Sequence, residues 1–187
     1  MTPYKENPAA ESLLQEVYDF DDFLPFQKEI IQSTLSGEDL LVVLPTGSGK
    51  SLCFQIPALL REGLTIVISP LIALMKDQID AMRARELPVE CIHSSIPQAE
   101  SRRVLDDIRA RRLKMIYISP ERLRDSFFLN ALLAGRQRPY LWVVDEAHCI
   151  TEWGHDFRTD YLHIPDAVKL LSEDAQMVMF TATATPE

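Results

Sequence analysis

Two short segments of the chain carry residue types that suit phosphate chemistry. The segment at 44–51 reads Leu-Pro-Thr-Gly-Ser-Gly-Lys-Ser, and the segment at 145–148 reads Asp-Glu-Ala-His. Each follows a run of aliphatic and β-branched residues, at 39–43 and 140–144, which is typical of a buried strand. Ligands bind beyond the carboxyl ends of strands in open α/β sheets, so both segments are expected at one site. Together they predict hydrolysis of a nucleoside triphosphate.

The residue types of the first segment suit a loop that holds phosphates. Gly47 and Gly49 can take positive φ, which lets successive backbone N–H groups point into one concavity. Lys50 brings a cation to the β- and γ-oxygens, and the Ser51 hydroxyl can ligate Mg²⁺. A helix predicted from Lys50 onward points its positive end at the same phosphates. The residues predicted to hold phosphates are Thr46, Gly47, Ser48, Gly49, Lys50 and Ser51.

The second segment supplies two adjacent carboxylates. Asp145 is expected to hold Mg²⁺ through water, while Glu146 orients and deprotonates the attacking water. A Gly-Ser-Gly turn can simply join a strand to a helix, and Asp-Glu pairs are usually solvated, so each short motif alone is weak evidence. Their joint placement after predicted strands favours a catalytic site of Glu146, Lys50 and Asp145.

One position departs from the general phosphate-loop pattern, which has Gly five residues before Gly49. Here that position is Leu44. The form Pro-Thr-Gly-Ser-Gly-Lys-Ser resembles the loop of superfamily 2 helicases and translocases, which tolerate this change. A small-molecule kinase or a GTPase is therefore less expected.

Length and composition indicate an ordinary globular domain. The chain has 187 residues, of which 47% are apolar and 25% charged. No apolar run approaches the roughly 18 residues that span a bilayer, and no signal-peptide pattern opens the chain, so no membrane partner and a cytosolic location are expected.

Three widely spaced cysteines argue against a disulfide framework or a zinc site. A net charge of −9 is awkward for binding nucleic acid, and the basic cluster at 102–114 suits a solvated helix face.

The chain alternates between strand-like and helix-like stretches. Strand-like runs occur at 40–44, 64–69, 89–92, 115–118, 140–145 and 177–181, with helical stretches near 50–61, 71–85, 98–112, 121–134 and 160–172. This alternation predicts an α/β fold with a mostly parallel β-sheet flanked by helices on both faces. Residues 1–36 are predicted to form two helices around an Asp-rich turn. Pro25 is expected in the first turn of the second helix, with Phe26 to Leu35 continuing it.

Five further segments resemble the RecQ DNA helicases of superfamily 2, and the resemblance covers nearly the whole chain. They are Phe23–Gln27, Ser69–Gln78, Ser119–Leu123, Cys149–Arg158 and Thr181–Thr183. The resemblance implies a RecA-like P-loop NTPase domain at 37–187, preceded at 1–36 by a helical segment with an adenine-reading motif. It also implies a second RecA-like domain, absent from this chain, so we interpret the chain as a fragment.

The resemblance gives roles to individual residues. Gln27 would read adenine with an amide that both donates and accepts, and Phe20 would stack on the base. His148 would couple the γ-phosphate site to Thr181 and Thr183. The residues expected to bind nucleic acid are Trp153, His155, Phe157, Arg158, Ser69, Lys76 and Gln78. The aromatic residues among these could instead belong to the core, and the last three could be ordinary strand-end and helix-surface residues.

The function implied by the resemblance is that of an ATP-dependent DNA helicase motor domain. It would couple Mg²⁺-dependent ATP hydrolysis to 3′–5′ translocation along single-stranded DNA and to unwinding of duplex DNA, beside the nucleoid in a bacterium or in the nucleus of a eukaryote. The missing domain would supply an arginine finger worth about 10³–10⁵ in rate, so this segment alone should hydrolyse ATP feebly. Two alternatives remain: a superfamily 2 motor acting on RNA, and a nucleotide-binding module without hydrolysis. The sequence indicates no oligomeric state.

Overall fold

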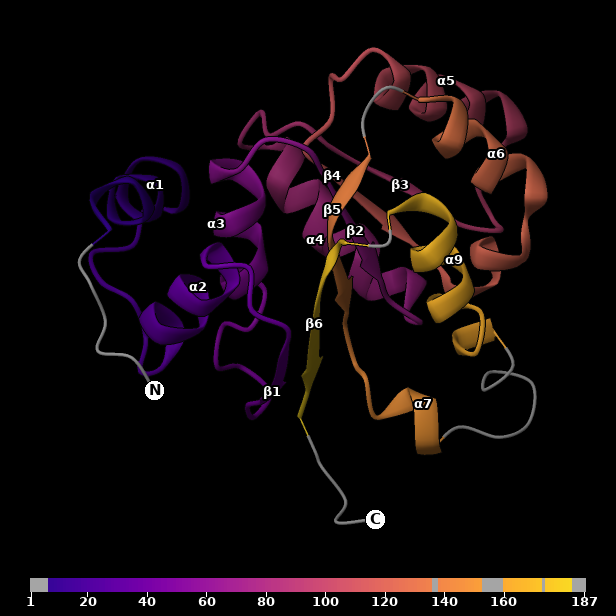
Figure 1. Ribbon diagram of the computed structural model, residues 1–187. Coiled ribbons are helices and arrows are strands. Elements are labelled where there is room, and N and C mark those ends of the chain that lie inside the picture. Colours follow the sequence, from indigo (N-terminus) through magenta and orange to yellow (C-terminus); the bar gives the residue numbers. More distant parts are fainter. Residues whose placement is uncertain (1–6, 136–137, 153–159, 173, 183–187) are drawn as a thin grey trace.

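A parallel β-sheet forms the centre of the computed structural model, which describes residues 7–135, 138–152, 160–172 and 174–182. Within these residues the sheet has six strands in the order β1-β6-β5-β2-β4-β3 (Figure 1). They are β1 (Leu40–Val43), β2 (Leu64–Ile68), β3 (Val89–Ile92), β4 (Met115–Ile118), β5 (Pro139–Val144) and β6 (Gln176–Thr181). Every pairing between them is parallel, which confirms the predicted fold class.

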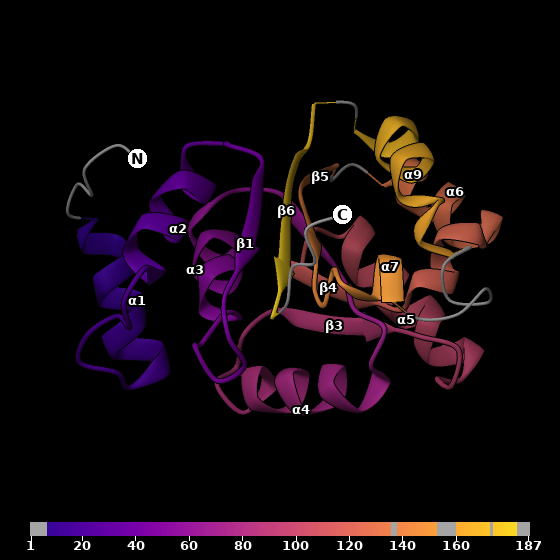
Figure 2. The ribbon, with the colours of Figure 1, turned by 90° about the horizontal axis from the view of Figure 1, so that it is seen from below.

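Helices cover both faces of the sheet. One face packs against α3 (Leu52–Leu60) and α4 (Ile72–Arg83). The other packs against α5 (Gln98–Arg109), α6 (Ser126–Ala134) and α9 (Ile164–Leu171), on the opposite side from α4 (Figure 2). Alternate residues of a strand point to opposite faces, so Trp142 and Val144 of β5 join one core, while Leu141 and Val143 join the other. This double burial explains why the strands appear in the sequence as continuous apolar runs.

The N-terminal helices form an outer layer on α3. Helix α1 (Pro8–Tyr18) and helix α2 (Gln27–Leu35) bury Leu14 and Ile31 against Ile56 of α3. Asp19 ends α1 in the left-handed conformation, within the predicted Asp-rich turn. The two-helix arrangement is therefore confirmed, whereas a domain boundary after residue 36 stays a prediction. None of the helices in the described residues is both long and apolar enough to cross a membrane.

The prediction that Phe26 lies inside the second helix is wrong. Phe26 has φ +69° and precedes the helix, which begins at Gln27. The reason is a local turn: the Gln27 backbone N–H donates to the Leu24 carbonyl at 3.2 Å, and the Gln27 side chain accepts from the Leu24 N–H at 2.8 Å. These two bonds close residues 24–27 into a turn in which Phe26 is left-handed, so the helix begins one residue later than predicted.

The stretch predicted as one helix over 121–134 consists of two elements. A 3₁₀ helix, η1, covers Pro120–Arg124, and α6 starts after Asp125. The Asp125 carboxylate accepts hydrogen bonds from the backbone N–H groups of Phe127 and Phe128, at 3.0 and 3.2 Å. A carboxylate that caps two orphan N–H groups starts a new helix at that point.

Candidate nucleotide site

The phosphate loop joins β1 to α3. Gly47 and Gly49 have φ of +81° and +70°, the region that glycine adopts freely, as predicted. A Cβ at Gly47 would meet nothing within 4 Å, whereas one at Gly49 would lie 2.4 Å from Nε2 of Gln27. Lys50 Nζ donates to the Leu44 carbonyl at 3.2 Å. The loop therefore has free space beside Gly47, whereas Gln27 fills the space beside Gly49. The Lys50 ammonium group is hydrogen-bonded to the backbone of the loop itself.

The remaining loop residues leave their polar groups at the open end of α3. Thr46 is exposed, and the Ser48 hydroxyl donates to the Pro45 carbonyl at 2.7 Å. Ser51 is half-buried at the N-terminus of α3, where its carbonyl accepts from the Gln55 N–H at 2.9 Å. No side chain caps the first turn of α3 among the described residues. An uncapped helix N-terminus offers N–H groups and a positive dipole to an anion.

Gln27 is 1% exposed and holds the phosphate loop from behind. Its Nε2 donates to the Gly49 carbonyl at 2.9 Å, while its Oε1 accepts from the Leu24 N–H. Phe20, in contrast, is 51% exposed and presents its ring to solvent. To read adenine, Gln27 would have to exchange one of these backbone partners for the base. Both adenine-binding roles stay predictions.

The two carboxylates follow β5 and are fixed by the neighbouring strands. The Asp145 N–H donates to the Ile68 carbonyl at 2.9 Å, and the Ala147 N–H donates to the Phe180 carbonyl at 2.8 Å. Between these bonds Glu146 has φ +53°, a left-handed conformation that is uncommon for Glu. Such strain costs about 1–3 kcal/mol and persists where the surroundings over-determine it, typically at functional sites.

Asp145 is buried without a direct cationic partner among the described residues. The residue is 5% exposed, and its carboxylate accepts from the Glu146 N–H at 3.0 Å. The pKa of Asp145 is raised to about 6, first by burial and then by the negative charge of Glu146, while the Glu146 N–H, Lys50 and His148 act to lower it. A buried carboxylate in this condition is stabilised by any cation placed against it.

His148 lies between the second carboxylate and β6. Its Nδ1 is 3.2 Å from Oε2 of Glu146 and 3.3 Å from Oγ1 of Thr181. Thr181 is also linked to the phosphate loop, because its carbonyl accepts from the Leu44 N–H at 3.0 Å. The structure therefore brings together His148, Glu146 and Thr181. Their coupling role stays a prediction, and Thr183 lies outside the described residues.

The residues predicted to bind nucleic acid divide into three groups. Ser69 is 1% exposed at the end of β2, and its hydroxyl has no hydrogen-bond partner among the described residues. Lys76 is exposed on α4, whereas Gln78 of the same helix accepts a hydrogen bond from the buried Tyr117 hydroxyl at 2.8 Å. Of these three, Lys76 is the side chain most open to a ligand. Trp153, His155, Phe157 and Arg158 lie outside the described residues.

Sequence reasoning missed the polar residues buried behind the site. Gln55 is 5% exposed in α3, and its Nε2 donates to the hydroxyl of Tyr117, which is fully buried in β4. The available signal was a single amide in the otherwise apolar helix Leu52–Leu60. An amide at a buried position needs a partner, so this pattern predicts a hydrogen bond without identifying the partner.

The comparison with protein families decides how this geometry is interpreted. Residues 24–187 match the DEAD/DEAH box helicase family, so the match covers most of the chain. The chain belongs to the DEAD/DEAH box helicase family. This helicase domain spans the phosphate loop, both carboxylates and every described strand.

Curated relatives confirm the resemblance to RecQ helicases. ATP-dependent DNA helicase Q5 of Rattus norvegicus is 43% identical over the whole chain, which covers 20% of that protein. ATP-dependent DNA helicase RecQ of Haemophilus influenzae is 42% identical over 96% of the chain, which covers 28% of it. The RecQ helicase of Synechocystis is 41% identical over 96% of the chain, which covers 38% of it. The helicase domain thus spans well under half the length of these relatives.

Solved structures support the fold. Helicase Lhr of Mycobacterium smegmatis, bound to single-stranded DNA and AMP-PNP, superposes with a TM-score of 0.70 at 24% identity, over 94% of this chain and 25% of Lhr. A hypothetical ATP-dependent RNA helicase from Sulfolobus tokodaii gives 0.69 at 21% identity, over 97% of this chain and 52% of that one. At these identities the likeness concerns the fold alone.

The residues present fit a nucleotide with Mg²⁺. The open backbone at Gly47 and the uncapped first turn of α3 suit phosphate oxygens. Asp145 supplies a hard oxygen ligand whose pKa is raised mainly by burial, and Ser51 supplies a hydroxyl at the same end of the sheet. Mg²⁺ prefers this combination of one carboxylate, a hydroxyl and substrate phosphates.

Proposed function

We propose that this domain is the ATP-binding motor of a RecQ-type DNA helicase, which couples Mg²⁺-dependent ATP hydrolysis to 3′–5′ translocation and unwinding of duplex DNA. The observation that carries the proposal is the junction after β5: a buried Asp145 with no ion pair among the described residues, beside a strained Glu146 that contacts His148. The names of the relatives, which are ATP-dependent DNA helicases, supply the substrate class. The polarity rests on the RecQ resemblance alone.

In this proposal, the side chains of the site divide the work of hydrolysis. When bound, ATP would supply the phosphoanhydride bond, and Mg²⁺ would neutralise part of its negative charge. Lys50 would leave the Leu44 carbonyl to reach the β- and γ-oxygens, while Asp145 and Ser51 would hold the metal. Glu146, whose carboxylate lies 3.2 Å from His148, would orient the attacking water and accept its proton.

Translocation requires that hydrolysis and DNA binding respond to each other. We propose that Thr181 takes part in this response, because it contacts His148 through its side chain and the phosphate loop through its backbone. Lys76 on α4 offers an exposed cation to the DNA backbone. The relatives are at least twice as long as this domain, and we propose that a second RecA-like domain of the same protein completes the site.

The decisive experiment measures ATP hydrolysis by the full-length protein with single-stranded DNA, with single-stranded RNA of the same sequence, and with neither. We expect strong stimulation by DNA, and displacement of a labelled strand from a duplex with a 3′ overhang. Stimulation by RNA alone would replace the proposal with an RNA motor. Nucleotide binding without hydrolysis under any condition would replace it with a binding module.

The isolated 187-residue chain gives a second test. We expect it to bind an ATP analogue but to hydrolyse ATP about 10³–10⁵-fold more slowly than the DNA-stimulated full-length protein, because an arginine finger from the partner domain is missing. Steady-state ATPase assays on both proteins measure this ratio. Robust DNA-stimulated hydrolysis by the isolated chain would show that the site needs no second domain.

A further inference from the structure

Two consecutive hydrogen bonds, one buried and one partly buried, form a chain that joins α3 to α4 through β4. Gln55 Nε2 of α3 donates to the Tyr117 hydroxyl at 3.2 Å, and this hydroxyl donates to Gln78 Oε1 of α4 at 2.8 Å. One hydroxyl therefore uses its donor toward one helix and an acceptor toward the other. The directions are consistent along the chain, so each bond polarises the next.

The surroundings of this chain are apolar, which makes its geometry hard to change. Tyr117 is fully buried, and its ring packs edge-on against Phe54, with 6.5 Å between ring centroids. Met75 and Ile79 of α4 belong to the same core cluster. Burial raises the pKa of Tyr117 well above its usual value, so the hydroxyl stays neutral and keeps its proton to donate. Separating the two helices would leave a buried polar group without a partner.

Each helix carries a part of the proposed function. Helix α3 follows the phosphate loop directly, and the Gln55 N–H bonds the carbonyl of Ser51, the last residue of that loop. Helix α4 carries Lys76, two residues before Gln78. In the present form Lys50 Nζ donates to the Leu44 carbonyl, so the Lys50 side chain at the start of α3 must move to bind phosphate. If the first turn of α3 shifts, the Gln55 side chain can transmit the shift to Tyr117.

We propose that Tyr117 is a positioning residue that holds the helix after the phosphate loop and the Lys76-bearing helix in a fixed relation, so that nucleotide binding changes the affinity of α4 for DNA. This inference rests on the proposed function, because it requires DNA to bind at α4. Gln55 connects Tyr117 to α3, and Gln78 connects it to α4. Gln78 thereby acts behind the DNA-facing surface, through Tyr117.

The test compares the affinity of the full-length protein for single-stranded DNA with and without a non-hydrolysable ATP analogue. The ratio of the two dissociation constants is the coupling factor, which is about 5–150 for linked sites. Tyr117→Phe removes the hydroxyl and keeps the ring. We expect this variant to keep DNA-independent ATP hydrolysis within about twofold and to lower the coupling factor about 3- to 10-fold, the usual effect of one hydrogen bond.

Two further variants separate this role from a merely structural one. Tyr18→Phe removes a buried hydroxyl that has no hydrogen-bond partner among the described residues, so it should leave the coupling factor unchanged. Gln55→Met removes the hydrogen bond between α3 and Tyr117. It should lower the factor as Tyr117→Phe does, and the double variant should lose no more than either single variant, since one chain is cut in each case.

The outcomes are distinct. A wild-type coupling factor in Tyr117→Phe, even with a lower melting temperature, would overturn the inference and leave the proposed function intact. An equal loss in Tyr18→Phe would also overturn it, because the effect would then follow from any lost buried hydroxyl. A wild-type protein without DNA-stimulated hydrolysis would instead contradict the proposed function, and the inference with it.

Discussion

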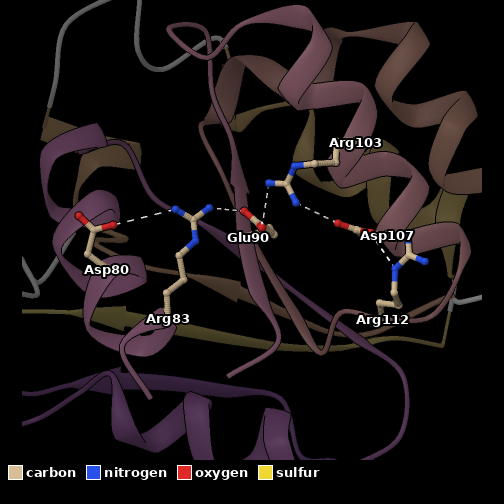
Figure 3. A network of polar contacts seen from close by, with 6 residues as sticks. All are labelled: Asp80, Arg83, Glu90, Arg103, Asp107 and Arg112. Carbon is tan, nitrogen blue, oxygen red and sulfur yellow. Dashed lines mark hydrogen bonds and ion pairs between the residues drawn. The ribbon is translucent and has the colours of Figure 1, made fainter. Parts of the chain in front are cut away.

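Two groups of charged side chains in this domain are built in opposite ways. At the outer edge of the sheet, Glu90 of β3 accepts from Arg83 of α4 and from Arg103 of α5, with 3.0 Å to the latter (Figure 3). Asp107 continues the network, with 3.1 Å to Arg103 and 2.8 Å to Arg112. In this edge network every carboxylate faces a guanidinium group. Because α4 and α5 cover opposite faces, Glu90 connects both layers.

The group after β5 has fewer such pairs: among the described residues Glu146 contacts His148, and Asp145 has no ion pair. Asp145 is buried beside a second carboxylate, Glu146, and its pKa is raised. Glu146 has a left-handed backbone, and Lys50 bonds a backbone carbonyl instead of a carboxylate. The edge network satisfies its own charges, so its function is structural. In the described part of the nucleotide site, Asp145 lacks an ion pair and Glu146 keeps a strained backbone, so a bound cation would stabilise the buried carboxylate.

The largest expected effect comes from removing the cation of the nucleotide site. Lys50→Ala should lower DNA-stimulated ATP hydrolysis of the full-length protein about 10²–10³-fold, because one donor to the developing phosphate charge is lost. Thermal unfolding should change little, since Lys50 has no ion pair to lose among the described residues. Equal damage to stability would show that Lys50 supports the fold.

Asp145→Asn should stabilise the domain in the absence of metal and nucleotide. Folding raises the pKa of Asp145 from 3.8 to about 6, so the ionised carboxylate destabilises the folded state. The penalty is absent below about pH 4, grows as pH rises, and is complete above about pH 6, where it amounts to about 3 kcal/mol. Denaturant unfolding at pH 7.5 and pH 4 measures it. A gain of the same size at both pH values would contradict the assignment to ionisation.

Glu90→Gln should act in the opposite direction. It removes the charge that two arginines share and should cost about 1 kcal/mol of unfolding free energy at pH 7.5, as expected for partly exposed ion pairs. ATP hydrolysis at 25 °C should stay within about twofold of wild type, since activity is independent of modest stability changes when the protein is folded. A large loss of activity would connect the edge network to catalysis.

Salt should produce the smallest effect. In 1 M NaCl the screening length falls to about 3 Å, so the stability difference between wild type and Glu90→Gln should shrink by less than about 1 kcal/mol. The effect of Asp145→Asn should persist, because buried charges are screened much less. Urea unfolding at low and high salt checks both expectations. A salt-sensitive Asp145→Asn difference would indicate a solvated carboxylate.

Features that depend on local pattern were predictable from the sequence, and features that depend on neighbours were not. The apolar run 115–118 indicated a buried strand because both sheet faces are covered, and the glycines of the loop indicated positive φ. The left-handed Glu146 was not predictable, because it lies between backbone bonds to the distant carbonyls of Ile68 and Phe180. The same holds for Gln27, whose partners come from the loop 21 and 22 residues away.

The most direct test compares one residue from each charged group. DNA-stimulated ATP hydrolysis is measured for the full-length protein carrying Glu146→Gln and for the protein carrying Glu90→Gln, two isosteric changes that each remove one negative charge. We predict a loss of about 10²–10⁴-fold for Glu146→Gln, as for removal of a general base, and less than about twofold for Glu90→Gln. Full activity in Glu146→Gln, or an equal loss in both variants, would contradict the account.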